Sequence, residues 1–284
     1  MRKVDLSAIT ITYNEIAKDA DALLFLARNT KLQEEMVERL KGFEIEISNN
    51  LETAIQNGTP REANILLGLR ALVQAGVAEL ELYLLLKQDL PDEAWDQLIK
   101  AQSSIGAAMR ADLSFLFLEA KAIRLRALED YLFPPQQFLS AGLIVGYQEC
   151  SICKESYDQC NHIAGRPYHG RFCNIILKDV TGDHVALVDE PANRHCRVTA
   201  FSVPGGTRNK MSWVITPHAV DHQSQDLPEG AMIAHSTIAS IEDFGGEWPS
   251  DLPFTRAVGS DGKYSKPISE RASRQPEPRH PDFS

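Results

Sequence analysis

The chain has 284 residues, of which 43 % are hydrophobic and 24 % are charged, and its formal net charge is −10. This composition is ordinary for a soluble globular protein with one large or two smaller domains. The acidic charge disfavours general binding to nucleic-acid backbones or anionic membranes. No apolar leader and no membrane-spanning run occur, so we expect a cytoplasmic protein without a membrane partner.

The two halves of the sequence differ in composition. All five cysteines and all eight histidines lie at or beyond Cys150, whereas residues 1–138 are rich in Leu, Ala, Glu and Arg. Pro134 and Pro135 cannot continue a helix, so they mark the change. We therefore expect an α+β protein with an antiparallel helical bundle at 1–138, a small β-rich domain at 139–254 and a flexible tail at 255–284.

Apolar residues at three- and four-residue spacing predict the first helices. One is expected from Glu15 to Lys41, with Gly42 as its stop or bend. A second is expected from Phe43 to about Gln56, where "NG" signals a turn.

The stretch "TPRE" predicts the start of the next helix, because Thr59 and Glu62 can form a capping box around a proline at the first helical position. That helix is expected to reach about Lys87, and another to run from about Leu90 to Tyr131 with a bend near 110–112. The helix at 59–87 is apolar around most of its circumference, which indicates a central bundle helix. An oligomer interface in the helical half is the alternative interpretation.

The second half changes to short runs rich in β-branched and aromatic residues. They are bounded by Gly, Pro, Asn and Asp, as strands are. The predicted strands are "GLIVGY", "FCNIILKDV", "HVALV", "CRVTAFSV" and "MSWVITP".

The stretch "CSICKESYDQCNH" concentrates possible metal ligands. Cys150 and Cys153 form a C-x2-C pair, Cys160 and His162 form a C-x-H pair, and Cys173 follows ten residues after the histidine. Soft ligands in short paired spacing favour Zn²⁺, which takes four such ligands in a tetrahedron. The expected set is Cys150, Cys153, Cys160 and His162, with Cys173 as the competing fourth ligand.

This zinc is expected to stabilise the fold and not to catalyse a reaction. A catalytic zinc keeps a position for water, whereas here at least four soft ligands are at hand. The H-x-E pattern of the cysteine-ligated deaminases is absent from the sequence. A small β-rich module that buries little apolar surface gains the most from such an ion.

The glycine-rich stretch at 162–173 connects the cysteine cluster to the next strand. It carries Arg166, Tyr168, His169 and Arg171, residue types that are frequent in binding surfaces. We interpret it either as a plain connection or as a recognition loop for a protein partner.

The segment "DHVALVDEPAN", residues 183–193, resembles the "hevSLVd.PAN" segment of tailed-phage head-maturation proteases. In that family the strand serine is the nucleophile, and the matching position here is Ala186. His184 and Asp189 therefore have no nucleophile between them, and the family's activity is not implied. Together with the spacing "CSIC…C.H..G..Y.G..C", the segment also resembles uncharacterised bacterial and prophage proteins, which implies a phage or mobile-element setting.

Three functions are consistent with these features. The favoured one is a non-enzymatic structural or adaptor protein with a structural zinc site, acting through protein contacts. The second is a hydrolase on a protease-like β scaffold, with Ser202, Ser212 or Cys196 as its nucleophile. The third is a zinc-dependent nucleic-acid-binding module, which requires a basic patch built from the sequence's arginines at 166, 171, 194 and 197.

Overall fold

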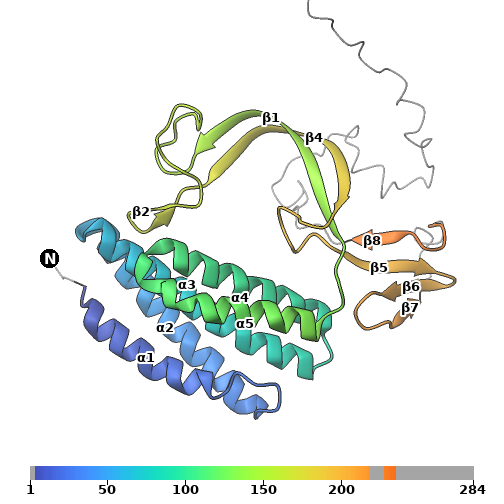
Figure 1. Ribbon diagram of the computed structural model, residues 1–284, viewed down its shortest axis with the longest axis horizontal. Coiled ribbons are helices and arrows are strands. Elements are labelled where there is room, and N and C mark those ends of the chain that lie inside the picture. The colour runs from blue at the N-terminus through green and yellow to red at the C-terminus, as the bar shows by residue number, and fades with distance from the viewer. Residues whose placement is uncertain (1–3, 218–226, 235–284) are drawn as a thin grey trace, which may run out of the picture.

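The computed structural model describes residues 4–217 and 227–234. It has the predicted α+β class: helices make up the first half, and small antiparallel sheets follow (Figure 1). The predicted tail at 255–284 lies outside the described residues.

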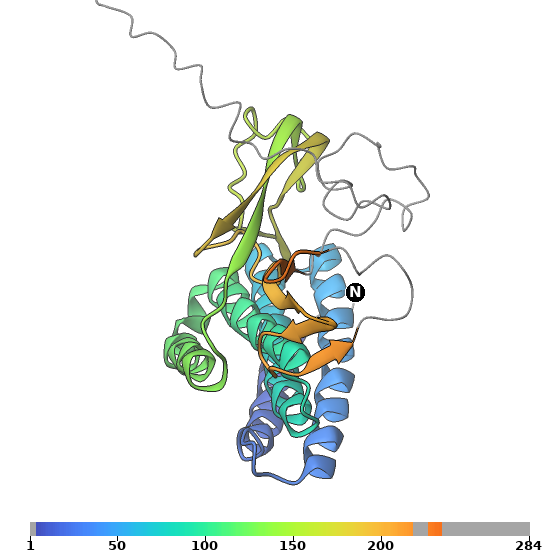
Figure 2. The same cartoon turned by 90° about the vertical axis from the view of Figure 1, so that its right-hand side faces the viewer.

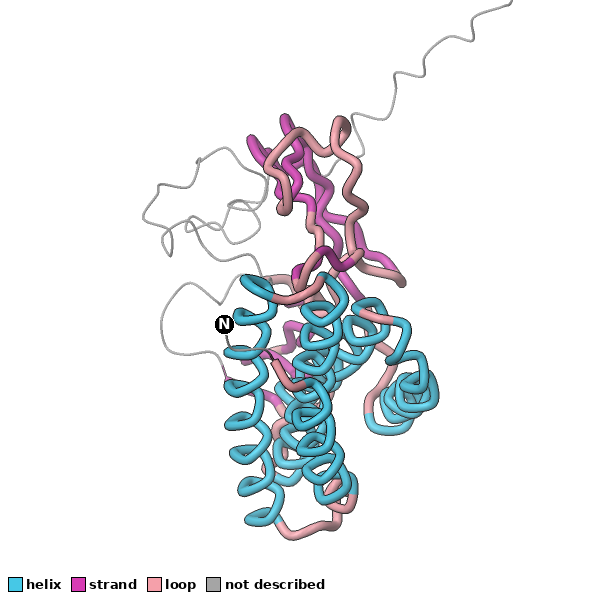
Figure 3. The backbone as a smooth tube through the Cα atoms, turned by 90° about the vertical axis from the view of Figure 1, so that its left-hand side faces the viewer, coloured by secondary structure: helices cyan, strands magenta, loops and turns pink. Residues whose placement is uncertain are grey.

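The helices occupy the chain from residue 6 to residue 132. They are α1 (Leu6–Asp21), α2 (Thr30–Asn57), α3 (Pro60–Lys87), α4 (Pro91–Ala111), the 3-10 helix η1 (Leu113–Leu118) and α5 (Glu119–Leu132). Helix α3 packs against both α2 and α4 and is buried on most of its circumference, as its apolar sequence predicts. Seen from the side, the helices form one bundle, and the β1–β4 ribbon stands above it (Figure 3).

The capping box at the start of α3 is confirmed. The Glu62 N–H donates to the Thr59 hydroxyl at 3.2 Å, and the Thr59 N–H donates to the Glu62 carboxylate at 2.8 Å. The expected bend after α4 is also present. Asp112 has an extended backbone there, and its carboxylate accepts the Ser114 N–H at 2.9 Å.

The prediction of one helix from Glu15 to Lys41 was wrong. The chain turns between Asp21 and Thr30, and α2 then continues through Gly42 without a stop. A buried polar side chain holds this turn, because the Gln33 amide donates to the carbonyls of Leu23 and Phe25 at 2.7 and 2.9 Å. Tertiary packing of α2 over its full length outweighs the local cost of one glycine.

The strands form three sheets within the described residues. Strand β1 (Phe138–Cys150) pairs with β4 (Ile175–Val188), and β2 (Pro167–Tyr168) pairs with β3 (Arg171–Phe172). The third sheet has the order β7-β6-β5-β8, made of β5 (Val198–Val203), β6 (Gly206–Asn209), β7 (Ile215–Pro217) and β8 (Met232–Ala234).

The β1–β4 pair is a long two-stranded ribbon that arches over the helices (Figures 1 and 2). The sequence predicted "FCNIILKDV" and "HVALV" as separate strands, but they are one strand. Asp183 is an extra residue that the ribbon accommodates as a bulge between the pairs Gly142–His184 and Leu143–Gly182.

The base of the ribbon is fixed to α4 by aromatic packing and ion pairs. Trp95, which is 1 % exposed, makes an edge contact with Phe133 and a tilted contact with Phe138, at ring centroid distances of 5.4 and 6.3 Å. The guanidinium of Arg197 lies 5.7 Å from the Trp95 ring and binds the Asp92 carboxylate. Arg194 similarly binds Glu129 and donates to Gln102 at 2.8 Å.

Within the described residues, none of the helices combines the length and hydropathy that a membrane crossing requires.

The pair of Arg197 and Asp92 should be a major support of the ribbon base. The Arg197 side chain is only 3 % exposed, so Asp92→Ala leaves a buried charge without its partner. We expect the free energy of unfolding to fall by about 3–5 kcal/mol. Urea denaturation followed by circular dichroism measures this change.

Asp19→Ala is the matched control, because it breaks an ion pair with Arg39 in which both side chains are about half exposed. The expected loss there is less than about 1 kcal/mol. Equal losses in the two variants would show that the ribbon base does not depend on the buried pair.

Candidate metal centre

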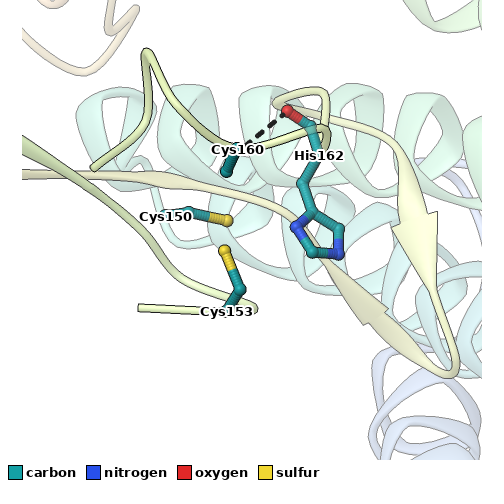
Figure 4. A group of neighbouring side chains, drawn as sticks. All are labelled: Cys150, Cys153, Cys160 and His162. Carbon is teal, nitrogen blue, oxygen red and sulfur yellow. Dashed lines mark hydrogen bonds between the residues drawn. The ribbon is translucent and has the colours of Figure 1, made fainter. Parts of the chain in front are cut away.

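The predicted cysteine and histidine ligands meet at the far end of the ribbon. Cys150 is the last residue of β1, and Cys153, Cys160 and His162 lie in the loop that leads to β2. The ligand atoms of these four residues all lie within 4.8 Å of one another (Figure 4). We call residues 150–173, which carry the cluster and the β2–β3 hairpin, the knob.

The turn between Cys150 and Cys153 orients both thiols. The Lys154 N–H donates to the Cys150 carbonyl at 2.9 Å, and Lys154 has a left-handed backbone with φ of 66°. The Ile152 N–H donates to the Cys150 sulfur at 3.4 Å. An N–H that points at a sulfur stabilises its thiolate form, which is the form that binds metals.

His162 supplies the nitrogen of the cluster. Its Nδ1 atom is buried and, within the described structure, has no hydrogen-bond partner. A buried polar atom without a partner is costly, and coordination of a metal ion removes that cost. Figure 4 shows one edge of the ring turned toward the sulfurs of the cysteines.

Two tyrosines brace the chain that follows His162. The Tyr168 hydroxyl accepts the Ile163 N–H, and the Tyr157 hydroxyl accepts the Ala164 N–H, both at 2.9 Å. The Tyr168 ring also meets the imidazole edge-on at a centroid distance of 4.6 Å. Sequence reasoning missed the role of Tyr157, although its position between the two ligand pairs was a usable signal.

Cys173 lies next to the cluster. Its buried sulfur is 3.7 Å from that of Cys150. Two thiolates bound to one tetrahedral Zn²⁺ are about 3.8 Å apart, which follows from metal–sulfur bonds of about 2.3 Å. The structure therefore gathers the four expected ligands, and the distance between the Cys150 and Cys173 sulfurs also fits Cys173 as the competing fourth ligand.

The thiols differ in acidity. Burial opposes ionisation of Cys150, but the N–H groups of Cys153 and Ile152 and the neighbouring thiols donate to its sulfur and lower its pKa to about 6. Burial and the nearby Cys150 raise the pKa of Cys173 to about 11, and burial also raises the pKa of Cys160. Cys150 is thus the thiolate at neutral pH, and the Cys173 thiol is placed to donate to it.

The donor set fits a soft metal ion. Three thiols and an imidazole are enough to fill the four positions of a tetrahedral zinc site. The described cysteines form no disulfide, so the thiols remain available as ligands.

The knob rests on the helices through the β2–β3 turn. His169 and Gly170 have left-handed backbones, with φ of 46° and 78°. The Gly170 N–H donates to the Asn64 side chain at 2.8 Å, and a Cβ atom on Gly170 would lie 2.9 Å from Leu51 and Ile55. This contact needs a glycine, because both the backbone angle and the close approach exclude a larger residue.

The predicted recognition loop is therefore partly internal. Tyr168 braces the knob, and the His169 imidazole lies 3.4 Å from the Ala54 carbonyl. Arg166 and Arg171 are exposed on the same loop. Arg194 and Arg197 lie instead at the ribbon base, bound to Glu129 and Asp92, so the structure does not join the four arginines in one patch.

The residues considered for hydrolysis have other roles. Ala186 lies opposite Ser140 in the ribbon, and the His184 imidazole contacts the Asp183 carboxylate at 3.0 Å. The Ser202 hydroxyl donates to the Pro228 carbonyl and accepts the Ala231 N–H at 3.1 Å. The Ser212 hydroxyl accepts the Val214 N–H at 3.4 Å. Within the described residues, neither serine hydroxyl is hydrogen-bonded to a histidine or a carboxylate.

Comparisons of the chain with protein-family models, with curated proteins and with solved structures find no match.

Metal content provides the first test of the site. Protein purified without chelator should contain one zinc ion per chain, and the double variant Cys153→Ser, Cys173→Ser should lose it because only three of the five candidate ligands remain. Elemental analysis gives the ratio directly. Cys196→Ser is the control, since Cys196 lies outside the cluster, and it should keep the full content. Full metal content in the double variant would contradict the assignment.

The pH dependence of metal affinity provides a second test. The lowered pKa of Cys150 means that this thiol is ionised without metal above about pH 6 and protonated below it. Binding below pH 6 must therefore release one proton more than binding above it. Competition with a coloured chelator should show affinity falling more steeply with pH below 6 than between 6 and 8. A constant slope across this range would show that the Cys150 thiol of the metal-free protein does not change its protonation near pH 6.

Proposed function

We propose that this chain is a non-enzymatic structural or adaptor protein whose zinc ion fixes the knob on the helical bundle. The observation that carries the proposal is a cluster at the end of a two-stranded ribbon, made of three thiols and an imidazole whose Nδ1 atom has no hydrogen-bond partner among the described residues. The proposed ligands are Cys150, Cys153, Cys160 and His162, with the Cys173 thiol donating to the Cys150 sulfur. The cytoplasm, where thiols stay reduced, is the proposed location.

The burial of the knob supports a structural role for the ion. Between residues 151 and 174, only Gly170 and Cys173 are buried. A segment of this length with so little buried apolar surface does not hold one conformation by packing alone. Metal binding supplies the missing stabilisation and is coupled to folding of the segment.

The exposed arginines of the knob support a role in protein contacts. Arg166 and Arg171 are presented at the end of a loop that the metal, Tyr168 and Gly170 hold in place. A guanidinium binds carboxylates with two parallel hydrogen bonds, so the proposed partner surface is acidic. Because the loop is already ordered before a partner binds, binding costs less conformational entropy.

The phage or mobile-element setting remains part of the proposal. It is supported by the resemblance of the 150–173 spacing and of the 183–193 segment to prophage proteins. The position of Ala186 separates the chain from the protease activity of the resembled family.

Exchange of the metal separates a structural site from a catalytic one. Cadmium is a soft ion that thiolates bind well, so a cadmium-loaded protein should keep the protease resistance of the knob. His162→Cys should also keep a four-ligand site and a folded knob. Limited proteolysis with mass spectrometry monitors both. A peptide or phosphodiester hydrolysis activity that the zinc form has and the folded cadmium form lacks would overturn the proposal.

Charge removal from the knob tests the partner contact. The double variant Arg166→Ala, Arg171→Ala should lose a bound protein that the native chain retains in quantitative affinity purification. The matched control is Lys100→Ala, Arg126→Ala, which removes the same charge from exposed positions on the bundle. Retention of the same proteins by both double variants would show that these arginines do not form the contact.

A further inference from the structure

The outer face of the ribbon is apolar. Phe138 and Cys150, both buried, lie an even number of residues apart on β1 and define its inner face. The intervening odd positions therefore form the outer face, where the cross-strand pairs include Leu139–Leu187, Ala141–Val185 and Val145–Val180. Beside these pairs the inner face carries Ser140, Gly142 and His184, and its exposed apolar residues Ile144 and Leu177 lie nearer the far end of the ribbon.

This apolar face is uncovered within the described residues. Leu187 is 52 % exposed, Val185 is 49 % exposed and Val180 is 43 % exposed. An isolated two-stranded ribbon is marginally stable in water, and a third strand or a packed segment on one face normally supports it. We therefore expect another segment to cover the exposed apolar side chains of the outer face.

The chain itself leads to this surface. Strand β8 ends with Ala234 opposite Val198, and the preceding residue Arg197 forms a bridge with Phe138, the first residue of β1. The chain thus leaves β8 directly beside the base of the ribbon, and the β8 arrow in Figure 1 points toward that base.

The segment that follows has the length and the composition to cover the ribbon. Residues 235–254 contain six large apolar side chains and then give way to a polar sequence: Ile238, Ile241, Phe244, Trp248, Leu252 and Phe254. Twenty extended residues span about 65 Å, whereas a strand of β1's length spans about 43 Å.

The size of the face argues against a second copy as its occupant. A two-stranded ribbon about 43 Å long and about 10 Å wide offers roughly 400 Å² per copy, about half of what each partner buries in a stable interface. A segment of the same chain needs no such area, because its effective concentration near the ribbon is high.

We propose that residues 235–254 dock on the outer face of the β1–β4 ribbon of their own chain. The segment shields the exposed apolar row and supports the ribbon between its two fixed ends. This inference does not depend on the identity of the metal or of the partner.

Photo-crosslinking of the full-length protein tests this docking. A benzoylphenylalanine placed at position 248 should form crosslinks to peptides of β1 or β4. Placed at position 264, beyond the apolar segment, it should form none. An equal mixture of ¹⁴N- and ¹⁵N-labelled protein identifies the source, because intramolecular crosslinks join peptides of one isotope only.

Two neighbouring positions of β1 give the matched control. Leu143→Ser alters the outer face and should lower the yield of the ribbon crosslink several-fold. Ile144→Ser alters the inner face at a residue that is 60 % exposed and should leave the yield unchanged. Mixed-isotope crosslinks would show that a second copy covers the outer face. An absence of ribbon crosslinks from position 248 would show that residues 235–254 do not cover it. Either result overturns the proposal.

Discussion

The far end of the β1–β4 ribbon contains almost no hydrophobic core, so another interaction has to hold it in place. At its base, Phe138 enters the aromatic cluster around Trp95. At the far end the chain gathers Cys150, Cys153, Cys160 and His162 instead of large apolar side chains. A metal ion bound there would replace the missing core and would help to hold the β2–β3 hairpin on α2 and α3.

The two ends of the ribbon are held by different physical interactions. Each end can therefore lose its structure while the other stays folded. The base relies on the ion pairs of Arg194, which is partly exposed, and of Arg197, whose buried charge makes its pair costly to break. The knob relies on thiolates and on one glycine contact with the helices. The bundle beneath has its own continuous core, so loss of the metal should release the knob without unfolding the helices.

Local sequence signals predicted the parts of this structure that are set by nearby residues. The capping box at Thr59 and the C-x2-C turn at Cys150 depend on spacing alone, and both could be identified. The continuity of α2 through Gly42 and the single long strand around Asp183 depend on packing and pairing with distant segments. The contact of Gly170 with α2 and α3 is also tertiary, so the loop's internal role could not be derived from its composition.

Hydrogen exchange of the zinc-loaded and chelator-treated protein tests whether the metal holds the knob in place. Chelation should remove amide protection in residues 150–173 and leave the protection of α3 unchanged. Unchanged protection of 150–173 would show that the cluster does not stabilise the knob. An equal loss in α3 would show that the metal supports the whole fold and not the knob alone.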